Sequence, residues 1–451
     1  MEATTFIRPE KGAELDLRIE SLAYGGNGIA RMEGYVVFVA GAIPGDLVRA
    51  VVTKRKRAYA EARTLEVLEP SPERIAPLAD HPGAPWQVLP YERQLEVKQE
   101  QVRDALTRIG RLEGFQLDDI VPAVEQWRYR NKLEYSFGTA QDGTLICGFH
   151  APGSWHDIVP IGDCLLASER SNLAREQVLA WCREQGLPAY DRRTHTGLLR
   201  NLIVREGRRT GQLQVRLVTG PGEIDGPSLA AAVDCDGLSW TVTEALAETT
   251  QGGETRKLAG NRTLEEELCG LSFSIAPNAF FQTNTEMAEQ LYGIAGDLAD
   301  LKGWERVYDL YCGIGTVGLS LAARAGEVWG LEIVEQAVAN AITNAKRNGI
   351  RNAKFFAGDV RLALRELVEE ASRPDVMVID PPRAGLSQKV VRRVLEVEAE
   401  KIVYVSCNPT TLAPNARQIV DAGYRMGPVT PVDMFPQTPH IECVTSFSRR
   451  S

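Results

Sequence analysis

Three short polar segments each follow a stretch with the composition of a buried β-strand. A glycine-rich turn spans 309–318 and contains the spacing Gly-x-Gly-x-x-Gly, and an Asp-Pro-Pro-Arg turn begins at Asp380. The third segment, 406–409, places the thiol of Cys407 directly after an apolar run. Ligands of open α/β sheets bind outside the carboxyl ends of parallel strands. The three turns are therefore expected to line one crevice.

The glycine-rich turn is suited to a nucleotide-like ligand. Glycines in a strand-to-helix turn let such a ligand approach the backbone, and Glu332, at the end of the next expected strand, can bind ribose hydroxyls. The motif alone does not separate a nicotinamide cofactor from S-adenosylmethionine. A tight turn that binds nothing also stays open as an alternative.

A thiol in this crevice has a specific chemical use. Carbon 5 of uracil is a poor nucleophile, but a thiolate that adds to carbon 6 generates an enolate able to attack a methyl sulfonium. The proton left on carbon 5 must then be removed by a general base. Glu442 is the candidate base because it opens a final expected strand over 443–447. The alternative for Cys407 is an inert buried thiol.

Taken together, these segments resemble the RNA uracil-C5 methyltransferases that make 5-methyluridine in 23S rRNA and tRNA. The resemblance covers nearly the whole chain. Its catalytic part comprises 280–284, 309–318, 380–385, 406–409 and 440–442. Its central RNA-binding part comprises 128–132, 137–138, 148–150, 163–164 and 197–200, and residues 12–69 look like the family's TRAM domain.

The resemblance implies a role for each matching residue. Cys407 would be the nucleophile and Glu442 the base. S-adenosylmethionine would be contacted by Gln282, Tyr311, Thr316, Glu332, Asp359 and Asp380. Asp380 could instead orient the uracil, and its assignment to cofactor or base stays open.

The sequence departs from the family pattern at one place. Many members hold an iron-sulfur cluster with three closely spaced cysteines and a fourth much later. Here 74–86 contains no cysteine, and only Cys164 matches the fourth ligand. We therefore expect no iron-sulfur cluster and no other metal. We expect Trp86, Leu78 and prolines to pack the 74–90 loop instead.

The elements that must position these residues follow a clear order. From residue 306 onward, strands and helices alternate, which predicts an α/β fold: a Rossmann-like class I methyltransferase domain with a mainly parallel, doubly wound sheet. Short β-rich runs over 12–69 predict an OB-like barrel, and a helix is expected over 91–109. The expected domains are a TRAM-like barrel over 1–70, a mixed α+β central RNA-binding domain over 71–92 and 119–276, and the methyltransferase domain over 93–118 and 277–451.

Charge and composition constrain the partners. The 451 residues include 51 Lys+Arg and 60 Asp+Glu, a net charge of −9, so an RNA partner requires local basic clusters. The clusters lie at 54–57, at 192–193 with His195, and at 205–209, and Tyr59, Phe149 and Trp155 could stack on unpaired bases. We expect RNA as substrate, 23S rRNA rather than tRNA, with no DNA and no membrane partner. We also expect a monomer, reduced thiols and a cytoplasmic location, since neither a spanning segment nor a secretory signal is visible.

Other functions fit the sequence less well. Cytosine-C5 enzymes usually carry a thiol in the Asp-Pro turn, which here reads Asp-Pro-Pro-Arg. A non-catalytic RNA-binding or ribosome-assembly factor would have no use for Cys407 and Glu442 beside the glycine-rich turn. A nicotinamide-dependent dehydrogenase would have no use for the Cys-Asn-Pro turn.

Overall fold

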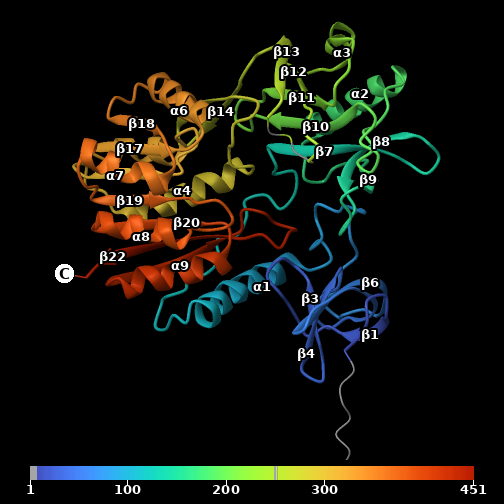
Figure 1. Cartoon of the computed structure of the whole chain (residues 1–451), viewed down its shortest axis with the longest axis horizontal. Helices are drawn as coiled ribbons and strands as arrows, with labels where there is room; N and C mark the ends of the chain where they lie inside the picture. The colour runs from blue at the N-terminus through green and yellow to red at the C-terminus, as the bar shows by residue number, and fades with distance from the viewer. Residues whose placement is uncertain (1–7, 248–249, 251, 451) are drawn as a thin grey trace, which may run out of the picture.

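The computed structural model describes residues 8–247, 250 and 252–450. Three large sheets dominate it, and each has its own core (Figure 1). The N-terminal sheet lies near one end of helix α1 (Tyr91–Asp104). The C-terminal part packs along the side of the same helix. The sequence prediction of a barrel, a mixed central part and an α/β C-terminal part is confirmed.

The N-terminal sheet curls into a small barrel. Its order is β1-β5-β6-β4-β3-β2. The strands are β1 (Glu14–Arg18), β2 (Ser21–Leu22), β3 (Gly28–Met32), β4 (Tyr35–Ala40), β5 (Leu47–Arg55) and β6 (Tyr59–Glu69). Along β4 and β5, buried and more exposed residues alternate, and Val37, Val39 and Val48 fill the interior. This period of two is what a sheet with one buried face requires.

The central sheet has the order β13-β12-β11-β10-β7-β8-β9. The strands are β7 (Lys132–Thr139), β8 (Leu145–His150), β9 (Ile158–Pro160), β10 (Leu199–Glu206), β11 (Leu213–Thr219), β12 (Gly237–Val242) and β13 (Glu254–Gly260). Helices α2 (Glu169–Glu184) and α3 (Gly226–Ala232) pack on its apolar face, where Leu202 and Leu217 lie in the core. A hairpin of β14 (Leu264–Leu268) and β15 (Leu271–Ile275) leads to the C-terminal part.

The C-terminal sheet has the order β18-β17-β16-β19-β20-β22-β21. The strands are β16 (Arg306–Leu310), β17 (Glu327–Glu332), β18 (Ala353–Ala357), β19 (Val376–Ile379), β20 (Lys401–Ser406), β21 (Tyr424–Val432) and β22 (Glu442–Arg449). The first five in this order are parallel, and β22 runs antiparallel to β20. The helices are α4 (Thr285–Ala299), α5 (Thr316–Leu321), the short 3-10 helix η2 (Ala322–Arg324), α6 (Glu335–Arg347), α7 (Val360–Ala371), α8 (Gln388–Val397) and α9 (Pro409–Asp421). Two separate cores show that helices cover both faces.

Helix α1 joins the sheets. It continues without a break into a π-helical segment, η1 (Ala105–Ile109), so the helix predicted over 91–109 is confirmed. Lys98 on α1 donates to Asp433 Oδ1 at 2.6 Å, and both side chains are fully buried. The chain after η1 then pairs with β21 through Leu117 and Val121.

The 74–90 loop is held differently from the prediction. Trp86 is buried as expected, but Leu78 is 68% exposed, so its predicted packing role is wrong. His81 is buried instead, and its Nε2 lies 3.2 Å from Cys164 Sγ. The imidazole, which also contacts the Phe149 ring, fills the space around this thiol.

The described residues contain neither a grouped set of metal ligands nor a membrane-spanning helix. In the ranges 8–247 and 252–450 with residue 250, no group of three or more His, Cys, Asp or Glu side chains is arranged to hold a metal ion. No helix in the described part of the chain is both long and apolar enough to cross a membrane.

Candidate active site

The eight residues predicted for the site come together at one edge of the C-terminal sheet. The strands β16, β17, β19 and β20 are parallel, so their carboxyl ends meet there. Tyr311, Glu332, Asp380 and Cys407 each follow or end one of these strands. Thr316 begins α5, Asp359 precedes α7, Glu442 begins β22, and Gln282 lies in the loop before α4.

Left-handed backbone shapes the turn between β16 and α5. Tyr311, Gly313 and Gly315 have φ values of 66°, 54° and 86°. A Cβ at Gly315 would lie 3.0 Å from the Phe355 ring, so this position requires glycine for space as well as conformation. The amide of Gly313 donates to Glu332 Oε2 at 3.2 Å, which ties the turn to the end of β17.

Asp309, which the sequence interpretation left without a role, is a buried carboxylate beneath this turn. Its Oδ2 accepts from the Gly318 amide at 2.8 Å. Its Oδ1 is buried and has no hydrogen-bond partner among the described residues. Burial, with the charges of Asp380 and Glu332 adding to its effect, raises the pKa of Asp309 to about 7. Its position at the start of the 309–318 motif was the available signal.

Three hydroxyls and two carboxylates line the rest of this crevice. Tyr292 Oη and Thr316 Oγ1 are 3.2 Å apart, and Tyr292 also contacts Gln282. On the other side, burial raises the pKa of Tyr311 to about 12, with Asp359 and Glu332 adding to the shift.

The crevice is thus rich in acceptors and carries negative charge. These residues fit a ligand that has ribose hydroxyls, N–H groups and a positive centre, because carboxylates accept from the first two and favour the third. The unpartnered Oδ1 of Asp309 and the open space at Gly313 are observations in favour of such a ligand. S-adenosylmethionine has all three features.

Cys407 lies between β20 and α9 in a fixed loop. Asn408 caps α9, since its Oδ1 accepts from the Thr410 amide at 3.0 Å. The Asn408 Nδ2 donates to the Arg383 carbonyl at 3.2 Å, which ties this loop to the Asp-Pro-Pro turn. Burial, with the charges of Glu442 and Asp380 adding to its effect and the nearby Arg383 charge opposing it, raises the pKa of the Cys407 thiol to about 12.

Glu442 lies beside this thiol because β22 pairs with β20. The register aligns Cys443 with Ser406, so the residue before Cys443 adjoins the residue after Ser406. Burial raises the pKa of Glu442 well above its usual value, and Asp380 raises it further. Burial also raises the pKa of Asp380 to about 7. A thiol and a carboxyl of raised pKa thus lie next to each other at this edge of the sheet.

Three further residues contact this space. Arg383 Nη2 lies 3.4 Å from His440 Nδ1, and burial together with the Arg383 charge lowers the pKa of His440 to about 4. Both residues lie within the segments 380–385 and 440–442, so the sequence already contains a signal for them. Tyr24, in the loop between β2 and β3, donates its hydroxyl to the Cys407 carbonyl at 3.1 Å. No local sequence signal connects positions 24 and 407.

Parts of the predicted basic clusters are not on the surface. Arg192 and Arg205 are buried, and Arg205 Nη2 donates to the Ala279 carbonyl at 2.8 Å, so the prediction that these two meet phosphates is wrong. Arg208 and Arg209 form ion pairs with Glu286 and Glu289. The 54–57 cluster lies at the end of β5 and in the turn after it, and Trp155 is 61% exposed.

Comparisons with known proteins agree with this geometry. A family model described as tRNA (Uracil-5-)-methyltransferase matches residues 263–450, and one described as TRAM domain matches residues 8–65. An uncharacterized RNA methyltransferase of Halalkalibacterium halodurans is 36% identical over 96% of each chain. Another, from Clostridium tetani, is 37% identical over 98% of each chain.

A solved structure extends the similarity to the whole fold. The tRNA (uracil-54, C5)-methyltransferase of Pyrococcus abyssi, in complex with S-adenosyl-L-homocysteine, superposes with a TM-score of 0.79 at 28% identity. The match covers 96% of this chain and 99% of that one.

Proposed function

Because the chain belongs to the family of S-adenosylmethionine-dependent RNA uracil-C5 methyltransferases, we propose that it methylates carbon 5 of a uridine in 23S rRNA. In this proposal Cys407 is the nucleophile and Glu442 the general base. The observation that carries it is the pairing of β20 with β22, which places this thiol and this carboxyl side by side at the edge where the cofactor crevice lies.

The residues act in a defined order. The Cys407 thiol gives up its proton to solvent, its sulfur bonds to carbon 6 of uracil, and the electron pair of the 5,6 double bond moves toward the carbonyl at carbon 4 as an enolate. Bound S-adenosylmethionine would supply the methyl group that carbon 5 takes up, with S-adenosyl-L-homocysteine as the leaving group. The Glu442 carboxylate removes the proton from carbon 5, and the electron pair of that C–H bond restores the double bond and expels the thiolate. Burial suits Glu442 to this step because it makes the carboxylate a stronger base.

The other predicted residues hold the reactants. Gln282, Tyr311, Thr316, Glu332 and Asp359 line the cofactor crevice in this proposal. Asp380 lies next to both the crevice and the thiol, since its charge raises the pKa values of Asp309 and Cys407. It therefore serves cofactor or uracil, and the two roles remain open.

We propose three domains, one around each large sheet. We assign RNA binding to the TRAM-like barrel of 1–70 and to the central domain of 71–92 and 119–276, and catalysis to 93–118 and 277–451. The contacts of α1 with the C-terminal sheet support the last assignment. The preference for 23S rRNA is the sequence prediction, which was based on the presence of both a barrel and a central domain; the Pyrococcus abyssi structure matches this chain over both as well. The alternatives are tRNA, the substrate in the printed name of the Pyrococcus abyssi enzyme, and a non-catalytic RNA-binding role. The monomeric state and the cytoplasmic location stay predictions.

Methyl transfer from labelled S-adenosylmethionine to total RNA lacking 5-methyluridine tests reaction and substrate together. After size fractionation and nucleoside analysis, we expect label in 5-methyluridine of the large rRNA. Label in tRNA would contradict the substrate, and label in 5-methylcytidine would contradict the base. Absence of label, with a folded protein that binds the cofactor, would favour the non-catalytic role.

Two variants test the mechanism. Cys407→Ala should abolish product while cofactor binding, measured by calorimetry, is retained, because the thiol forms the bond that activates carbon 5. The matched control is Cys269→Ala, an exposed cysteine after β14, which should keep full activity. Normal turnover by Cys407→Ala would refute the proposed nucleophile.

Glu442→Gln should slow the last step, so a covalent protein–RNA species should accumulate and be visible on a denaturing gel. A folded variant that turns over without this species would contradict the role of Glu442.

A further inference from the structure

A cavity of about 350 Å³ lies where the central sheet meets the C-terminal part of the chain. Strands β11, β12 and β13 form one wall, and the segments 261–263 and 276–278 form a second. Gln336 and Asn340 of α6 complete the lining. Its volume lies within the range of about 300–1,000 Å³ typical of small-ligand clefts. None of the steps above uses it.

The alternation of residues along β11 explains why this cavity is polar. Val215 and Leu217 lie in the core beneath α2 and α3. Gln214 and Arg216 alternate with them in the sequence and therefore lie on the opposite face of the sheet. The parallel pairing of β11 with β12 places Ser239 beside Arg216 on that face. The face toward the C-terminal part thus carries hydrogen-bonding groups and positive charge.

Gln214 lines the cavity with an amide that has no partner in the protein. The residue is only 8% exposed. A Cβ at Gly237 would lie 3.2 Å from Gln214 Cγ and 2.5 Å from the Asn261 carbonyl, so glycine at this position leaves the room that the side chain occupies. The amide makes no hydrogen bond with the described residues, and neither of its polar atoms is enclosed by them. It therefore reaches solvent through the cavity, where a ligand can bind to it.

Asn278 presents donors to the same cavity. Arg216, which is 3% exposed, donates to Asn278 Oδ1, and this bond fixes the orientation of the amide. The Nδ2 group makes no hydrogen bond with the described residues, and Asn278 is exposed and lines the cavity. The amide thus offers its N–H groups rather than its oxygen. The charge of Arg216 lies directly behind it.

The charges of the lining favour an anion. Lys257 and Arg262 line the cavity, and no acidic residue of the described chain does. Lys257 donates one N–H to the Gly260 carbonyl at 3.0 Å and keeps two for a ligand. Arg262 is exposed and makes neither an ion pair nor a hydrogen bond with the described residues. Two cations beside N–H donors are what a phosphate requires, because charge-assisted hydrogen bonds to its oxygens are strong.

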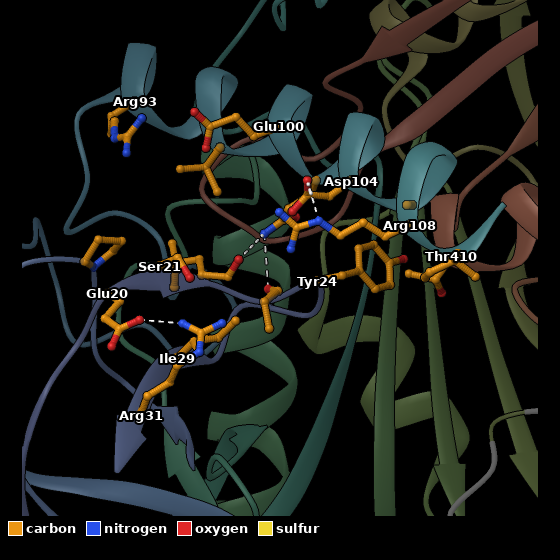
Figure 2. A pocket seen from close by; sticks show the side chains of 17 residues that line it. Glu20, Ser21, Tyr24, Ile29, Arg31, Arg93, Glu100, Asp104, Arg108 and Thr410 are labelled. Atoms are coloured by element: carbon orange, nitrogen blue, oxygen red, sulfur yellow. Dashed lines mark hydrogen bonds and ion pairs between the residues drawn. The ribbon is translucent and has the colours of Figure 1, made fainter. Parts of the chain in front are cut away.

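A cavity of equal volume between the barrel and α1 has the opposite character (Figure 2). Glu20, Glu100 and Asp104 line it. Its Arg31 pairs with Glu20, and Arg108 Nε lies 3.3 Å from Asp104 Oδ1. A phosphate there would have to compete with these carboxylates. The absence of described carboxylates therefore distinguishes the cavity beside the central sheet.

The cavity beside the central sheet borders the two segments that lead into the cofactor crevice. Asn278 lies four residues before Gln282, so their Cα atoms are at most about 14 Å apart. Helix α6 begins three residues after Glu332. A phosphate in the cavity and a uracil at the crevice can therefore belong to one bound RNA strand. RNA supplies such a phosphate at every nucleotide, and most contacts that position a nucleic acid are made to its backbone.

We propose that this cavity binds a backbone phosphate of the substrate RNA, held by Arg262, Lys257 and the amides of Gln214 and Asn278. A phosphate contact fixes the register of the strand without reading its sequence. The site thus holds the RNA near the target uridine, and other groups select the base. The inference rests on the proposed function, because it takes the bound RNA to be the methylated one.

Three variants test the proposal in the full chain. Arg262→Gln removes the unpaired guanidinium and breaks no contact with the described residues, and Gln214→Glu replaces the buried amide by a carboxylate of the same shape. Arg392→Gln is the matched control, because Arg392 is exposed on α8, has no ion pair with the described residues and does not line the cavity. The probe is an unmodified 23S rRNA transcript, or a tRNA transcript if tRNA is the RNA that is methylated.

We expect the Kd of the transcript, measured by filter retention, to rise about tenfold in Arg262→Gln and further in Gln214→Glu. The slope of log Kd against log salt concentration should fall by about 0.7–0.9 in Arg262→Gln, because one phosphate contact no longer releases counterions. Arg392→Gln should change neither quantity. In Arg262→Gln the kcat and the affinity for S-adenosylmethionine should stay within about twofold of the wild type, since the cavity takes no part in methyl transfer.

The outcomes separate this proposal from the proposed function. If the wild type methylates the transcript and Arg262→Gln has the wild-type Kd and salt slope, the phosphate site is wrong and the function stands. If the wild type binds the transcript without methylating it, the function fails, and a reduced slope in Arg262→Gln alone still supports the site. If the wild type binds neither transcript, both proposals fail.

Two further results would overturn the site. Equal weakening of RNA binding by Arg262→Gln and Arg392→Gln would show a general effect of charge. Saturable binding of inorganic phosphate that Arg262→Gln abolishes, with an unchanged Kd for RNA, would assign the cavity to a small anion.

Discussion

At the scale of single residues, the site contains a thiol and two carboxyls that all resist ionisation, because the pKa of each is raised. Burial raises the pKa of Cys407 to about 12 and that of Asp380 to about 7, and raises that of Glu442. Thiolate, not thiol, is the nucleophile. In the protein without RNA, Cys407 should therefore be almost entirely protonated at neutral pH, which limits its unwanted reactions.

The first prediction concerns the reactivity of this thiol. Alkylation of Cys407 by iodoacetamide should accelerate about tenfold per pH unit between pH 7 and 10, in step with the thiolate fraction. Glu442→Gln should speed alkylation at pH 9 because it removes a charge that raises the pKa. Arg383→Gln should slow it because it removes a charge that lowers the pKa. Peptide mass spectrometry measures the rates, and shifts of both variants in the same direction would contradict this electrostatic account.

The second prediction concerns Asp309. Its pKa of about 7 in the folded state exceeds the ordinary value of 3.8, so its folded form binds a proton more tightly than the unfolded chain. The contribution of Asp309 to stability is therefore greatest below pH 4 and is lost as pH rises toward 7, by about 4 kcal/mol at most. Asp309→Asn removes this loss but leaves an amide N–H unpaired, at about 1–3 kcal/mol.

Asp309→Asn should thus be less stable than the wild type at pH 4 and more stable at pH 8. Urea unfolding at the two pH values measures this. Asp297→Asn, an exposed aspartate on α4, should show no such reversal.

At the scale of elements, two loops from distant parts of the chain hold the thiol. The loop before α9 is tied to the Asp-Pro-Pro turn by Asn408, and its carbonyl at Cys407 is held by Tyr24 of the barrel. Burial raises the pKa of Tyr24, so its hydroxyl keeps the proton that it donates. The barrel thus contributes to the position of the proposed nucleophile.

Tyr24→Phe tests this contribution. Loss of one hydrogen bond of about 1 kcal/mol should lower kcat roughly five- to tenfold, with the KM for S-adenosylmethionine unchanged. Tyr35→Phe is the control, since Tyr35 donates to the Lys56 carbonyl within the barrel. Equal kcat values for the two variants would show that the Tyr24 hydroxyl does not position the loop.

At the scale of the whole molecule, buried polar contacts join α1 to the C-terminal sheet. Lys98 donates to Asp433, and Tyr91 Oη donates to the other oxygen of the same carboxylate at 2.8 Å. Burial lowers the pKa of Lys98, and the charge of Asp433 opposes that shift. Removal of one partner leaves a buried charge without compensation.

Lys98→Met should therefore destabilise the protein by about 3–5 kcal/mol. Adding Asp433→Asn should recover part of the loss because the unpaired charge disappears. Lys302→Met, which removes an exposed ion pair with Asp300, should cost less than about 1 kcal/mol. Denaturant unfolding measures all three, and a Lys98→Met loss as small as that of Lys302→Met would contradict this account.

The sequence by itself determined which strand ends carry the residues that could do chemistry. The Gly-x-Gly-x-x-Gly turn, the Asp-Pro-Pro turn and Cys407 each follow an apolar strand, and the carboxyl ends of parallel strands must meet at one edge. The alternation of strands and helices after residue 306 predicted the α/β fold. This was possible because hydrophobic periodicity is a property of residues close together in the sequence.

Only the tertiary structure decided which distant residues share the site. Tyr24 donates to the Cys407 carbonyl although 383 positions separate them in the sequence. Burial raises the pKa of Asp309, and His81 lies beside Cys164. The same packing buries Arg192 and Arg205, which the sequence predicted to lie on the surface and meet phosphates. Burial and contact between distant segments depend on how whole sheets pack, and no local pattern carries that information.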